Sequence, residues 1–141
     1  MAKSVKCGFD SQPGGAKGQQ LLVAYGPTLL VNIGFDPSYK PGQQGPPVAG
    51  IEGLRALVDT GATESCIDST LATTLALPVV DRRRVCGSSG EHEVNVYLAQ
   101  VHVPSLQYTI YGAFAGVHLQ AGGQPHVALL GRTFLRSLTM T

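Results

Sequence analysis

One short stretch, residues 56–62 (Ala-Leu-Val-Asp-Thr-Gly-Ala), constrains the fold and the function of this chain more than any other. Its first three residues are apolar and run into a turn signal, which predicts a short buried strand. Asp59 ends that run, and a carboxylate at such a place is costly unless it is paired or hydrogen-bonded. Thr60 supplies a hydroxyl group beside it, and Gly61 permits a sharp turn or the close approach of another backbone. The stretch predicts a reactive carboxylate on a tight loop, although an ordinary hairpin turn would be built from the same three residues, Asp-Thr-Gly.

Length and charge exclude several classes of protein. A chain of 141 residues is long enough for one domain with its own core. The net charge is +1 and only 13% of the residues are charged, so no nucleic-acid partner is expected. The one basic cluster, residues 82–84, is short and favours a solvated turn over a binding patch. No apolar run is long enough to span a membrane, so no membrane partner is expected either.

The cysteines and histidines give no sign of a cofactor. Cys7, Cys66 and Cys86 are an odd number at unrelated spacings, which argues against a disulfide framework and indicates a reducing compartment. The first residues hold no apolar segment of signal-peptide length, so a cytoplasmic location is expected. The histidines have no metal-ligand spacing, so neither a metal nor another cofactor is expected, and each is assigned to the surface or a strand face: His92, His102, His118 and His126.

The pattern along the chain predicts many short strands joined by turns, as its 18 glycines suggest. Residues 1–20 are expected to be a flexible lead-in, and residues 36–50, rich in proline and glycine, a surface loop. Extended segments are expected at residues 21–25, 28–33, 51–58, 79–85, 93–103, 107–111, 113–119 and 126–130. Short helices are expected at residues 69–77, after the N-cap candidates that begin at Asp68, and at 133–138.

Four of these features follow one another in an informative order. Leu57-Val58-Asp59-Thr60-Gly61-Ala62 comes first, and an apolar return at Cys66-Ile67 follows it. A glycine-tipped hairpin at residues 85–95 comes next, and Ala128-Leu129-Leu130-Gly131-Arg132 comes last. In this order the chain resembles the retropepsin-like aspartic proteases, which include the retroviral proteases and a related domain of ubiquitin-shuttle proteins. The resemblance covers roughly residues 21–141, which we therefore expect to be the protease domain.

The resemblance implies a fold and an activity. The fold is all-β and mostly antiparallel, a closed acid-protease barrel with one or two short helices. Such chains carry one Asp-Thr-Gly each and act as homodimeric endopeptidases on peptide or protein substrates. Asp59 from each chain would form the catalytic pair, Thr60 would brace the two loops across the two-fold axis, and Gly61 would leave backbone groups free for the substrate.

The resemblance also assigns the remaining residues of the site. Ala62 would line the substrate site, and the hairpin tip would be a flap that closes over the peptide, with Cys86, Gly87, Ser88, Ser89 and Gly90 in contact with it. Leu129 and Leu130 would pack beneath the catalytic loop, with Leu130 reaching the substrate. Gly131 and Arg132 would support that loop from the following helix.

The sequence departs from the family's pattern in three places. Retroviral members carry an Asp shortly after Asp-Thr-Gly-Ala that pairs with the Arg of the Gly-Arg element, whereas Thr63 and Glu64 follow here. The partner of Arg132 is therefore open between Glu64 and Asp68. The flap tip lacks bulky apolar residues, and only residues 138–141 follow the last helix, so the chain is either cropped or dimerises differently. The polar tip leaves a second interpretation, a peptide-binding or scaffold module that cleaves little.

Overall fold

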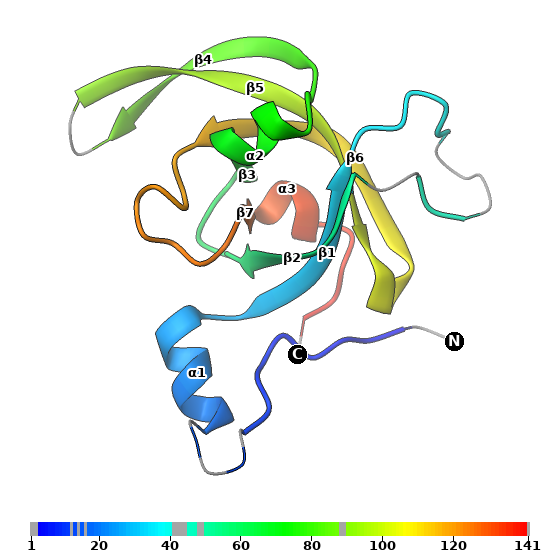
Figure 1. Cartoon of the computed structure of the whole chain (residues 1–141), viewed down its shortest axis with the longest axis vertical. Coiled ribbons are helices and arrows are strands. Elements are labelled where there is room, and N and C mark those ends of the chain that lie inside the picture. Colours follow the sequence, from blue (N-terminus) through cyan, green and yellow to red (C-terminus); the bar gives the residue numbers. More distant parts are fainter. Residues whose placement is uncertain are drawn as a thin grey trace.

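Six strands close into a barrel, and a seventh extends from it (Figure 1). The computed structural model describes residues 3–11, 13, 15, 17–40, 45–47, 50–87 and 90–140. Around the ring the order is β1-β2-β7-β3-β6-β5, and a pairing between β1 and β5 closes it. The bounds are β1 (Thr28–Gly34), β2 (Ile51–Val58), β3 (Cys66–Asp68), β4 (Val79–Gly87), β5 (Gly90–Val103), β6 (Tyr108–Val117) and β7 (Ala128–Leu130).

The direction of the strands confirms the expected fold class. Five of the pairings are antiparallel, and two, β2 with β7 and β3 with β6, are parallel. The segments expected at 107–111 and 113–119 merge into the single strand β6, Tyr108–Val117, whose residues 108–115 pair with β5. The chain is thus a closed, mostly antiparallel β fold. The parallel pairing of β2 with β7 places the chain segments that follow these two strands at the same end of the barrel.

The described part of the chain holds three short α-helices and one 3₁₀ helix around the barrel, where one or two short helices were expected. They are α1 (Gly18–Tyr25), α2 (Ser69–Thr74), α3 (Arg132–Leu135) and η1 (Pro104–Leu106). Asp68 caps α2, because its Oδ2 accepts a hydrogen bond from the Leu71 amide at 3.2 Å. That cap was predicted from the sequence, although the helix ends three residues before the expected position.

The expectation of an extended segment at residues 21–25 was wrong, because these residues form the last part of α1. Glutamine, leucine and alanine are good helix formers, and they fill most of the segment. The Gln20 side chain accepts a hydrogen bond from the Lys17 amide at 3.2 Å, which stabilises the first turn. Gly26, with φ 75°, ends the helix in a conformation that glycine adopts readily. The boundary expected at residue 21 stays a prediction, and Val5 and Cys7 already pack against the core.

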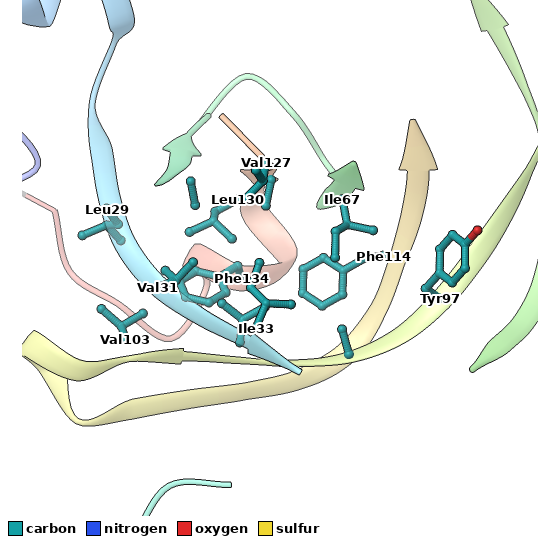
Figure 2. Close-up of a cluster of buried hydrophobic side chains, with 14 of the residues drawn as sticks. Leu29, Val31, Ile33, Ile67, Tyr97, Val103, Phe114, Val127, Leu130 and Phe134 are labelled. Atoms are coloured by element: carbon teal, nitrogen blue, oxygen red, sulfur yellow. The ribbon is translucent and has the colours of Figure 1, made fainter. Parts of the chain in front are cut away.

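The interior of the barrel is apolar and comes from every strand of the ring (Figure 2). Phe134 of α3 lies in it fully buried, and its ring meets that of Tyr108 edge-on with centroids 5.8 Å apart. The short helix α3, which follows β7, is therefore stabilised by packing in the core, because a helix of this length is not stable by itself. The labelled side chains of Figure 2 are Leu29, Val31, Ile33, Ile67, Tyr97, Val103, Phe114, Val127, Leu130 and Phe134.

Asp68 is a buried carboxylate that holds two segments together. Besides capping α2, its Oδ1 accepts hydrogen bonds from the amides of Leu119 and Gln120 at 3.0 and 3.2 Å. Its side chain is only 2% exposed, and these three donors compensate for its removal from water. The structural role expected for Asp68 is confirmed.

His126 is fully buried, so the surface or strand-face role expected for it was wrong. Its Nε2 lies 2.9 Å from Thr28 Oγ1, and its Nδ1 has no hydrogen-bond partner among the described residues. Burial lowers the pKa of this imidazole, and the charge of Arg55 lowers it further. The neutral ring is therefore the form that the folded chain holds.

This burial predicts a loss of stability in mild acid. Below the ordinary histidine pKa of about 6.5, His126 is protonated in the unfolded chain but not yet in the folded chain, where its pKa is lower. The free energy of unfolding should therefore fall as the pH drops through that value, until the lower pKa of the folded state is reached. Urea unfolding between about pH 5 and pH 8 measures the slope. His126→Gln should flatten it and His118→Gln, at an exposed position, should not; an unchanged slope in His126→Gln would contradict the assignment.

Candidate active site

Asp59 lies where β2 ends, on a loop that its own backbone and carboxylate shape. Its amide donates a hydrogen bond to the Leu130 carbonyl at 3.0 Å, which continues the pairing of β2 with β7. Its Oδ1 accepts a hydrogen bond from the Gly61 amide at 3.0 Å, and its carbonyl accepts one from the Ala62 amide at 3.2 Å. These hydrogen bonds hold the half-buried carboxylate at the first residue of a tight turn.

The next two residues of the motif face outward. Thr60 and Gly61 are exposed, whereas Ala62 is half-buried. Exposed loop residues beside a half-buried carboxylate leave this side of the loop open to another molecule. Asp59, Thr60 and Gly61, which were predicted to act as one site, lie together on this loop.

Gly131 lets a second segment lie directly against this loop. A Cβ atom at this position would touch the Glu64 carbonyl oxygen and would lie 2.9 Å from that of Ala62. The Gly131 amide donates to Ser65 Oγ at 3.0 Å, and this hydroxyl lies 3.1 Å from Thr133 Oγ1. Only glycine fits so close a backbone approach. The supporting role expected for Gly131 is consistent with this packing.

Backbone hydrogen bonds fasten the start of α3 to the same loop. The Arg132 amide donates to the Ala62 carbonyl at 2.9 Å, and the Thr133 amide donates to the Thr63 carbonyl at 3.1 Å. The loop that carries Asp59 is therefore held against the start of a helix by two backbone hydrogen bonds.

The side-chain partner of Arg132 is Thr63, so both partners considered from the sequence were wrong. Arg132 Nη2 donates to Thr63 Oγ1 at 2.6 Å. Glu64 instead forms an ion pair with Arg83, and Asp68 is occupied by backbone amides. A threonine hydroxyl carries no charge that would mark it as a partner in the sequence, but the loop brings that of Thr63 to the guanidinium group.

The hairpin of β4 and β5 extends beyond the barrel like an arm (Figure 1). Its strands pair as far as Gly87 with Gly90, and Cys86 near its end is exposed. Ser88 and Ser89, expected to contact the substrate, lie outside the described residues.

The arginines of residues 82–84 lie in β4, within the extended segment expected at residues 79–85, and not in the solvated turn that the charge pattern favoured. Two of them face Glu93 and Glu91 across the hairpin at 3.9 and 3.8 Å, where exposed pairs contribute little stability. Arg83 is different, because its partner Glu64 follows the Asp59 loop. That pair connects the hairpin to the segment that follows the Asp59 loop, and no local pattern in the sequence indicated it.

The remaining apolar residues of the site differ in how far they are buried. Leu130 is fully buried in the core, so its expected contact with a substrate was wrong. It supports the loop instead, because its carbonyl accepts the hydrogen bond from the Asp59 amide. Leu129 is half-buried. Cys66 is half-buried as well, and burial, followed by the charge of Glu64, raises the pKa of its thiol.

A closed β barrel that presents one Asp-Thr-Gly loop, backed by a Gly-Arg helix start, defines the class of aspartic-type endopeptidases. Residues 48–137 match the model of the family described as "gag-polyprotein putative aspartyl protease". The match spans more than half of the chain, and the chain belongs to the retropepsin-like aspartic proteases. The family predicted from the sequence is confirmed.

Two solved structures resemble the chain more distantly. The solution structure of simian foamy virus (mac) protease has a TM-score of 0.48 and 16% identity, covering 77% of this chain and 91% of its own. The EIAV protease complexed with the inhibitor HBY-793 has a TM-score of 0.47 and 18% identity, covering 81% and 92%. No curated protein matches the chain in sequence. Among the described residues, none of the helices has the length and apolar character needed to cross a membrane.

Proposed function

We propose that the chain cleaves peptide bonds as a homodimer, in which Asp59 of each copy supplies half of the catalytic pair. The observation that carries this proposal is the open loop itself: one half-buried carboxylate is flanked by the exposed Thr60 and Gly61. General acid–base cleavage by carboxyl groups requires two of them at one place. A second copy of the same loop, related by a two-fold axis, supplies the missing group.

The chemistry follows from two carboxyl groups that share one proton. Two such groups close together do not both ionise easily, so one is a carboxylate and the other keeps its proton. The carboxylate takes a proton from a water molecule, which attacks the carbonyl carbon of the scissile bond, while the protonated partner donates a hydrogen bond to the carbonyl oxygen. Collapse of the tetrahedral intermediate breaks the carbon–nitrogen bond, and the amine leaves with a proton.

The hairpin of β4 and β5 is the element suited to cover the substrate. It reaches beyond the barrel, and the pair between Arg83, in the middle of β4, and Glu64 joins it to the segment that follows the Asp59 loop. Closure over a bound peptide would exclude water from the reaction and hold the peptide in place. Cys86, Gly87 and Gly90 would lie near the peptide in that state.

We also propose a reducing, cytoplasmic setting for the enzyme. Cys7, Cys66 and Cys86 are all free thiols. An exposed thiol at Cys86, close to the end of the hairpin, would be open to oxidation outside such a compartment.

The dimer makes activity depend on concentration. Diluting the enzyme should lower its specific activity along the same curve as the fraction of dimer measured by sedimentation velocity, because neither copy holds a complete site. A peptide library digested over a dilution series supplies the activity. Specific activity that stays constant where only monomer sediments would contradict the proposal.

A further inference from the structure

The last five residues of α1, residues 21–25, are all apolar (Leu-Leu-Val-Ala-Tyr). Successive residues of an α-helix are turned by about 100°, so five in a row cover every face of the helix. The helix also has no charged residue in its sequence. A helix that is apolar on all sides is normally buried on all sides.

The described chain covers only a small part of this helix. Gly18 is its one buried residue and lies against the backbone of Phe9, whose ring is 6.0 Å from that of Tyr25. Leu22, Val23 and Tyr25 are 39%, 88% and 41% exposed. Among the described residues, those that form the core or pack against it include none from α1.

The exposed helix is attached directly to the catalytic loop. The chain passes from α1 through Gly26 to Pro27, whose carbonyl accepts a hydrogen bond at 2.9 Å from the amide of Val58, the residue before Asp59. Thr28 then pairs with Leu57. In Figure 1 the last turn of α1 and the arrowhead of β2 lie on the same side of the molecule.

We propose that the exposed apolar face of α1, formed by Leu22, Val23 and Tyr25, packs against a second copy of this chain in the active dimer. The proposal rests on the function proposed above, because that function requires two Asp59 loops to meet. A surface joined to the loop through Pro27 and Val58 lies beside the two-fold axis when the loops meet. In such an isologous interface each copy offers the same patch, and an uncharged apolar patch meets its equivalent without repulsion.

The chemistry of α1 favours a second copy over other occupants. A helix that binds an anionic lipid surface carries lysine or arginine on its polar face, and α1 carries neither. An unrelated protein partner would not complete the active site. A second copy completes the site and covers the helix in the same contact.

Val23→Lys tests the proposal with little risk to the fold. The Val23 side chain is 88% exposed, lysine is a better helix former than valine, and a positive charge is favourable near the end of a helix. Val80→Lys is the matched control: Val80 is 52% exposed and belongs to β4, at the end of the molecule away from α1 in Figure 1. Sedimentation velocity gives the dimer dissociation constant of each variant and of the wild type.

We expect Val23→Lys to raise the dissociation constant at least about tenfold, as placing a charge in an apolar contact does, and Val80→Lys to leave it within about twofold. Joining two Val23→Lys copies by a flexible linker should restore peptidase activity by raising their effective concentration. Equal dissociation constants for wild type and Val23→Lys would overturn the interface and leave the dimeric peptidase intact. A wild type that dimerises through α1 yet cleaves no peptide would refute the proposed function and leave the interface standing.

Discussion

Replacing Asp59 with Asn should lower kcat/KM by about two to four orders of magnitude, the range over which a positioned acid or base accelerates a reaction. Asparagine has nearly the same shape, and its side-chain oxygen still accepts the hydrogen bond that the Gly61 amide donates to Asp59 Oδ1. It has no carboxylate, so neither copy of the variant can activate a water molecule. Digestion of a peptide library before and after the substitution measures the effect.

The control for this variant is a measurement of its stability, and not a substitution at another site. Because the half-buried Asp59 is held mainly through backbone groups, the midpoint of urea unfolding should change little. A variant with normal stability and near-normal cleavage would mean that Asp59 is not the catalytic group. A wild type that binds peptides tightly but cleaves none would favour the scaffold interpretation.

Replacing Gly131 with Ala should damage both the fold and the activity. The added Cβ would touch the Glu64 carbonyl oxygen and would lie 2.8 Å from the Glu64 carbonyl carbon. Backbone atoms do not move aside as a flexible side chain does, so we expect a loss of about 2 to 3 kcal/mol in the free energy of unfolding. The loop that carries Asp59 must shift to relieve the contact, so cleavage should fall as well.

Gly112→Ala is the matched control for this prediction. A Cβ at Gly112 would have no heavy atom within 4 Å, and Gly112 pairs with Ala99 of β5. Chemical denaturation and peptidase assays of both variants give the comparison. Equal stability of Gly131→Ala and Gly112→Ala would show that the close approach at Gly131 is not required.

The sequence predicted the local features of the fold because local patterns encode them. Strand β2 has the expected bounds, Ile51–Val58, since an apolar run, a proline-rich loop before it and a turn after it define it. The cap at Asp68 was visible because an N-cap residue and the helix it starts are neighbours in sequence. The order of the Asp-Thr-Gly loop, the hairpin and the Gly-Arg element identified the family.

What the sequence did not predict depends on contacts between distant residues. The run at residues 21–25 carries no clear period, so nothing local separated a strand from the helix α1. The pair of Arg83 with Glu64 and the bond of Arg132 to Thr63 form only when the barrel closes. The burial of His126 and Leu130 likewise depends on which strands meet, and not on the residues beside them.

Mixing wild-type chains with Asp59→Asn chains tests most directly whether each copy contributes half of the site. Equal amounts are combined well above the dissociation constant and left until the copies have exchanged, with total protein kept constant. If only dimers with two aspartates are active, about a quarter of the wild-type activity should remain, because random pairing produces that share of intact sites. If about half remains, each chain acts alone, and the account of a site shared between two copies is wrong.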